Sequence, residues 1–168
     1  IALVFNAVDN DEGLGDVLNV LADYNLRTTF FVGGDFIRHN PDSVRMLADS
    51  VHEIGSLFYT HMDMTDYRYR IDTNFVVRGL GRNEDEFFNT TGTEVSTFWH
   101  APWYVVSPPV LEASQRMNYL YVGRDVDPLD WVTLNGPRGT RDLYKTSSTL
   151  VEQLLGDVRP GSIVPIRV

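Results

Sequence analysis

The chain has 168 residues, of which 43% are hydrophobic, 12% aromatic and 22% charged, the balance of a folded globular domain. Fourteen lysines and arginines against 23 aspartates and glutamates give a net charge of −9, which argues against a nucleic-acid partner. Cysteine is absent, so disulfides and thiolate-based metal sites or nucleophiles are excluded. No apolar run approaches the roughly 20 residues that span a bilayer, and no membrane span is expected in this segment.

Strand and helix patterns alternate along the chain. Residues 1–5 (IALVF) form a predicted strand, and the next apolar residues recur at the spacing of one helical face: Leu14, Val17, Leu18 and Leu21. The later segments follow from apolar periodicity, β-branched and aromatic content, and capping residues. They predict, in chain order, a strand at residues 28–32, a helix at 41–51, a strand at 52–57, a more polar helix at 73–89 interrupted near Gly79 and Gly81, a strand at 97–99, a helix at 107–117, a strand at 119–122, a helix at 147–158 and a final strand at 162–168.

Repeated strand–helix units with nearly continuous apolar strands indicate a parallel sheet covered by helices. A complete eight-stranded barrel needs about 250 residues, so the predicted α/β fold is a shortened or distorted (β/α) barrel of parallel strands with outer helices. An open parallel sheet is the alternative. Either architecture places a functional site at the carboxyl ends of the strands.

The two chain ends have the pattern of buried strands. Residues 1–5 are apolar from the first position, and residues 162–168 end inside another apolar run. Because natural chain ends are usually polar and frayed, we expect residues 1–168 to be one domain of a longer protein, with neighbouring domains as partners.

Four segments resemble motifs of the polysaccharide deacetylase (NodB-like) family. Residues 51–65 (VHEIGSLFYTHMDMT) resemble its second motif, usually GHEIGNHTYSHPDLT, and residues 27–32 (RTTFFV) are similar to its KATFFV strand. Residues 126–131 (VDPLDW) resemble its fourth motif, and residues 160–164 (PGSIV) its last strand. The resemblance implies a distorted barrel and a zinc- or cobalt-dependent hydrolase that removes acetyl groups from polysaccharides. It also implies an extracytoplasmic location, whether secreted, periplasmic or at the cell surface.

The metal positions of the family are altered in this chain. The resemblance places the metal ligands at Ala7, Leu57 and His61, and only His61 has a side chain that can ligate. A hydrolytic zinc or cobalt ion takes about three protein ligands, so no cofactor is expected. One alternative remains, in which a different turn brings Asp9 toward His61 and rebuilds a site for one divalent metal.

The acid and base positions are altered as well. The base aspartate of the family is Asn6 here, the arginine that holds it is His100, and the acid histidine is Arg167. Asn6 does not take up a proton at neutral pH, and a guanidinium does not release one. The resemblance matches Asp130 to the aspartate that orients the acid histidine. Paired replacement would therefore place Asp130 within salt-bridge distance of Arg167, and Asn6 near His100.

Aromatic residues flank these positions. The family counterpart of Trp131 forms a wall of the sugar groove, and Trp103 and Tyr59 are candidates for the opposite wall. An aromatic wall binds the apolar face of a pyranose without a metal. The alternative for each of these residues is packing in the core.

Three functions remain open at this point. The first is a deacetylase-like domain that has lost its chemistry and binds glycan or supports its neighbours. The second is an active metal-dependent deacetylase of N- or O-acetylated polysaccharide, with a site rebuilt from His61 and Asp9. The third is a purely structural domain. We favour the first, because the replacements affect the metal, base and acid positions together.

Overall fold

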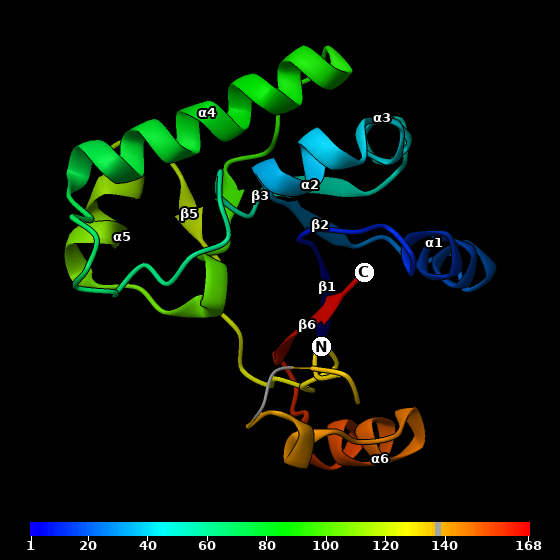
Figure 1. The fold of residues 1–168 in the computed structure, drawn as a ribbon. Coiled ribbons are helices and arrows are strands. Elements are labelled where there is room, and N and C mark those ends of the chain that lie inside the picture. Colours follow the sequence, from blue (N-terminus) through cyan, green and yellow to red (C-terminus); the bar gives the residue numbers. More distant parts are fainter. Residues whose placement is uncertain (137–138) are drawn as a thin grey trace.

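The computed structural model describes residues 1–136 and 139–168 (Figure 1). Six parallel strands form one sheet in the order β5-β4-β3-β2-β1-β6, which curls into a half-barrel with the helices outside it. This confirms the predicted distorted barrel of parallel strands. The strands are β1 (Ala2–Ala7), β2 (Thr29–Val32), β3 (Glu53–Ser56), β4 (Phe98–Trp99), β5 (Leu120–Tyr121) and β6 (Ile163–Arg167).

The helices follow the predicted order with two differences. The segment before Asn40 forms a short helix that was not predicted, and the helix predicted with an interruption near Gly79 and Gly81 is continuous. In the described part of the chain, no helix has the length and apolar character needed to cross a membrane. The helices are α1 (Leu14–Asp23), α2 (Gly34–His39), α3 (Pro41–Ala48), α4 (Thr73–Thr91), α5 (Pro108–Gln115) and α6 (Ser147–Asp157), with 3₁₀ turns at Pro102–Tyr104 and Arg141–Leu143.

Apolar side chains fill three clusters around the sheet. One packs β1, β2 and β3 against α1, α2 and α3, and a second joins β4 to α4 and α5. The third lies at the sheet centre and consists of Val4, Val8, Phe31 and Leu57. The alternation of side chains along each strand separates the clusters, because successive residues of a strand point to opposite faces.

The segment after β5 links the two edges of the half-barrel. Strands β5 and β6 occupy opposite ends of the strand order. The main-chain N–H of Asp125 donates to the carbonyl of Ile163 at 2.9 Å, and its carboxylate accepts from the N–H of Ile163 at 2.8 Å. The chain between these edges is therefore held against β6, and its next residues reach the carboxyl end of the sheet.

A close approach between α4 and the loop after β3 requires a glycine. Gly79 faces the ring of Phe58, which is almost completely buried and has a positive φ of 69°. A Cβ atom at residue 79 would overlap that ring. Gly79 therefore marks a packing contact and not the helix interruption predicted from sequence.

We predict that Gly79→Ala destabilises the fold by about 1–3 kcal/mol, because the buried Phe58 ring has no free space to enter. Gly81→Ala is the matched control, since a Cβ atom there meets nothing within 4 Å. Alanine should stabilise this helical position by about 0.5–1 kcal/mol. Urea unfolding measures both changes, and equal effects of the two substitutions would contradict the packing role of Gly79.

Candidate functional site

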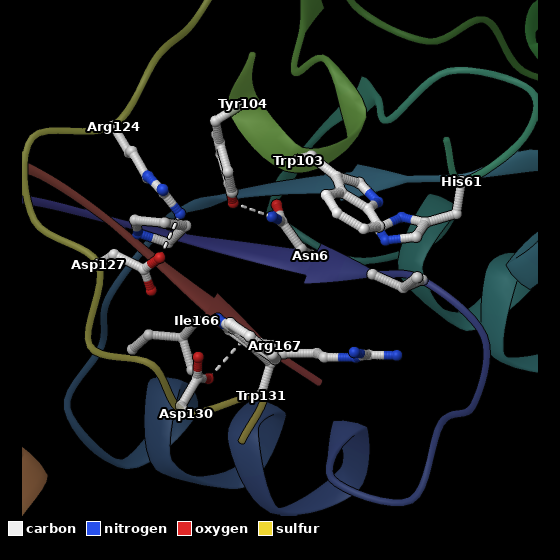
Figure 2. A pocket seen from close by; sticks show the side chains of 12 residues that line it. Asn6, His61, Trp103, Tyr104, Arg124, Asp127, Asp130, Trp131, Ile166 and Arg167 are labelled. Carbon is white, nitrogen blue, oxygen red and sulfur yellow. Dashed lines mark hydrogen bonds and ion pairs between the residues drawn. The ribbon is translucent and has the colours of Figure 1, made fainter. Parts of the chain in front are cut away.

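A cavity of about 270 Å³ lies at the carboxyl end of β1 and β6 (Figure 2). Its walls come from β1, β6, the loop after β3, the 3₁₀ turn after β4 and the segment after β5. The lining residues are Asn6, Val8, His61, Trp103, Tyr104, Arg124, Asp127, Asp130, Trp131, Pro165, Ile166 and Arg167.

The metal positions implied by the resemblance are mostly apolar and buried. Ala7 is fully buried in the cluster between the sheet and α1–α3, and Leu57 belongs to the central cluster. Of these three positions, only His61 lines the cavity and has a side chain that can bind a metal. Across residues 1–136 and 139–168, no group of three or more His, Cys, Asp or Glu side chains is arranged to hold a metal ion. This donor set does not fit a hydrolytic zinc or cobalt site.

Arg167 is paired with Asp9. Its Nη2 donates to Asp9 Oδ1 at 2.7 Å, and the two side chains are 33% and 55% exposed. Burial raises the pKa of Asp9, but the hydrogen bond and charge of Arg167 outweigh it, and the net pKa lies below the ordinary value. The carboxylate that a rebuilt metal site would use is thus engaged by a guanidinium.

His61 lies at the rim of the cavity. Its main-chain N–H donates to Asp35 Oδ2 at 3.3 Å, so α2 holds the loop that carries it. Partial burial lowers the pKa of the His61 imidazole and the charge of Arg167 lowers it further, while Asp9 and Asp35 act in the opposite direction. The net lowering of this pKa favours the neutral imidazole.

Asp130 does not form the predicted salt bridge. Its Oδ2 accepts from the main-chain N–H of Arg167 at 2.6 Å. The Arg167 guanidinium extends away from Asp130 (Figure 2) and donates to Asp9. The prediction was wrong because the sequence match placed the two residues together without indicating which part of Arg167 faces Asp130.

Asn6 and His100 are connected through Tyr104. The Asn6 amide donates to the Tyr104 hydroxyl, and the Tyr104 ring meets the His100 ring edge-on at 4.9 Å. The predicted proximity therefore takes the form of a shared tyrosine and not a direct hydrogen bond.

His100 is fully enclosed. It packs against Phe31 with ring centroids 3.8 Å apart, and its Nδ1 faces the carbonyl of Val122. Burial lowers the pKa of His100 to about 4, against the opposing effect of that carbonyl. The imidazole is neutral with its proton on Nδ1, and it is not part of the cavity lining.

Two of the three predicted aromatic residues form walls of the cavity. Trp103 and Trp131 line it and are 57% and 41% exposed. Positive φ angles at Trp103 and Tyr104 turn the chain sharply at this point. Tyr59 lies elsewhere, clamped between Arg38 and Arg82, whose guanidinium carbons are 4.5 and 4.1 Å from its ring centroid.

Three polar lining residues, Tyr104, Arg124 and Asp127, had no specific role assigned from the sequence. Arg124 forms an ion pair with Asp127 and lies 4.7 Å from the centroid of the Tyr104 ring. Asp127 lies inside the VDPLDW motif and Tyr104 directly follows Trp103. Their position beside residues already expected in the groove was the only sequence feature that could have indicated them. No comparable signal marked Arg124.

A family model and curated relatives both match this chain to polysaccharide deacetylases. The family model described as polysaccharide deacetylase matches residues 1–122. The peptidoglycan-N-acetylmuramic acid deacetylase PdaA of Bacillus subtilis is 26% identical over 147 residues, covering 88% of this chain and 51% of that protein. A chitooligosaccharide deacetylase of Rhizobium leguminosarum bv. trifolii is 27% identical over 164 residues, covering 98% and 69%. The chain spans about half the length of several curated relatives.

A solved structure with a similar fold is described as a carbohydrate esterase family 4 pseudoenzyme from Bacillus anthracis. It is 20% identical, with a TM-score of 0.83 over 99% of this chain and 53% of that one. A mutant of the same pseudoenzyme, described as having restored enzymatic activity, aligns with a TM-score of 0.83 and 19% identity over 99% of this chain and 55% of that one.

We predict a coupling energy of about 0.2–1 kcal/mol between Asp9→Asn and Arg167→Gln, because the ion pair is largely open to solvent. The matched cycle of Asp130→Asn with Arg167→Gln should be additive, since Asp130 accepts its hydrogen bond from the main chain of Arg167. Urea unfolding of the single and double variants gives both values. Coupling confined to the Asp130 cycle would mean that Arg167 pairs with Asp130 in solution.

Proposed function

The chain belongs to the polysaccharide deacetylase family, and on this basis we propose that it is a non-catalytic carbohydrate-binding domain. The observation that carries the proposal is a cavity with exposed Trp103 and Trp131 beside positions that no longer hold catalytic groups. Indole faces bind pyranose rings by apolar contact, and this needs no metal.

The polar groups of the cavity suit binding better than hydrolysis. The Asn6 amide takes up no proton at neutral pH, and the Arg167 guanidinium gives none up. Asp9 is held by Arg167, and the buried His100 is away from the cavity. The amide, carboxylate and guanidinium groups of the cavity can instead form hydrogen bonds with the hydroxyl groups of a sugar, as polar groups in a ligand site usually do.

An active deacetylase with a rebuilt site is the second candidate. It is favoured by the matched relatives, which are named as deacetylases, and by the neutral His61 at the cavity rim. It requires Asp9 to leave Arg167 and a further ligand to join His61. The purely structural role is the third candidate, and it predicts no sugar binding.

The relatives also support a proposal about the biological setting. Two of them are named as peptidoglycan deacetylases, enzymes of a wall polymer outside the cytoplasm. We therefore propose an extracytoplasmic location, a polysaccharide as partner, and neighbouring domains in a longer chain.

Trp131→Ala should weaken binding of an acetylated chito- or xylo-oligosaccharide by about 2 kcal/mol or more, a factor of roughly 30, because it removes one wall of the cavity. Its melting temperature should change little, since the side chain is 41% exposed. Tyr67→Ala is the matched control, an aromatic residue 95% exposed and outside the cavity. Isothermal titration calorimetry tests this. Unchanged binding, or a large fall in melting temperature, would make Trp131 a structural residue.

Metal content tests the second candidate directly. After dialysis the purified chain should hold well under one equivalent of zinc or cobalt, because the donor set is too small. The double variant Ala7→Asp/Leu57→His is the positive control, and zinc should raise its melting temperature but not that of the wild type. One equivalent of metal in the wild type that is lost in His61→Ala would favour the active enzyme.

A further inference from the structure

One carboxylate of the cavity lining, that of Asp130, has no ion-pair partner among the described residues. Its four charged lining residues besides the neutral His61 are Arg124, Asp127, Asp130 and Arg167. Arg124 is neutralised by Asp127, and Arg167 by Asp9 at 2.7 Å. Among the described residues, no lysine, arginine or histidine forms an ion pair with Asp130.

The Asp130 carboxylate retains hydrogen-bonding capacity toward the cavity. Oδ2 accepts the main-chain N–H of Arg167, and a carboxylate has about four acceptor positions in all. The side chain is half-buried and lines the cavity. Burial, followed by the charge of Asp127, raises the pKa of Asp130 against the main-chain N–H groups of Arg167, Asp130 and Trp131. A partly desolvated carboxylate of this kind is stabilised by a cation that binds beside it.

The aromatic walls favour the same kind of ligand. Trp131 follows Asp130 directly in the sequence, and both line the cavity with Trp103 (Figure 2). A pyranose bound against either indole would share the cavity with this carboxylate. Indole faces also attract cations through the ring quadrupole, and tryptophan does so best of the aromatic side chains.

From this arrangement we propose that the cavity prefers sugars with a free, protonated amino group over their N-acetylated forms, with Asp130 as the receptor of the ammonium group. This inference rests on the proposed carbohydrate site and names the substrate class of that site. Deacetylated glucosamine polymers present this group at each residue, so the domain would recognise the product of a deacetylase.

The test is calorimetric titration with tetramers of glucosamine and of N-acetylglucosamine, at a mildly acidic pH that keeps the amine protonated. The wild type should bind the glucosamine tetramer about tenfold more tightly, the range expected for one charge-assisted hydrogen bond. Asp130→Asn, which keeps an acceptor for the Arg167 N–H, should abolish this preference, so that the two tetramers bind with equal affinity. The preference should decrease as salt is added.

Asp23→Asn is the matched control, because it removes one exposed carboxylate of α1 outside the cavity and tests for general attraction to an acidic protein. Tighter binding of the acetylated tetramer by the wild type would overturn the preference and leave the carbohydrate site standing. An equal loss in Asp23→Asn and Asp130→Asn would overturn the role of Asp130. Failure of both tetramers to bind would overturn the inference together with a chitooligosaccharide-binding site. The wild-type comparison remains decisive even where the Asp130 variant does not fold.

Discussion

The parallel pairing of β1 with β2 on one side and β6 on the other is the constraint on which the site depends. In this register Asn6 lies opposite Phe31 of β2 and opposite Arg167 of β6, so residues far apart in sequence meet at one edge of the sheet. The carbonyl of Asn6 also accepts from Val168 at 3.2 Å. This pairing brings Asp9, which follows β1, within reach of the Arg167 side chain at the end of β6. The Asp9–Arg167 ion pair therefore forms at the carboxyl end of the sheet.

The same strand pairing places Ala7 and Leu57, at the family's metal positions, in apolar surroundings. An aspartate at position 7 and a histidine at position 57 would each add polar groups to apolar surroundings, at a cost unless a ligand compensates. Ala7 and Leu57 instead extend the apolar clusters. Two ion pairs neutralise Arg124 and Arg167, and the Asn6 amide and the His100 ring both contact Tyr104.

Much of the fold followed from the sequence, because strand and helix patterns depend on local periodicity. The parallel barrel-like sheet was predicted correctly. Trp103 and Trp131, predicted as groove walls, both line the cavity, and their role in sugar binding stays a prediction. The pairing of Arg167 was not predicted correctly, since a motif match places a main chain and does not specify where a long flexible side chain ends. Tyr59 was assigned to the cavity for the same reason, whereas two guanidinium groups hold it elsewhere. Gly79 was interpreted as a helix interruption because the contact with Phe58 comes from a distant segment.

The central claim is that this family member keeps a carbohydrate cavity without the family's hydrolytic chemistry. Acetate release from acetylated chito- and xylo-oligosaccharides tests it most directly, measured with the wild-type chain in the presence of zinc or cobalt and again with a chelator. Acetate should be released no faster than in a protein-free blank under both conditions. Metal-dependent release above the blank that is lost in His61→Ala would contradict it.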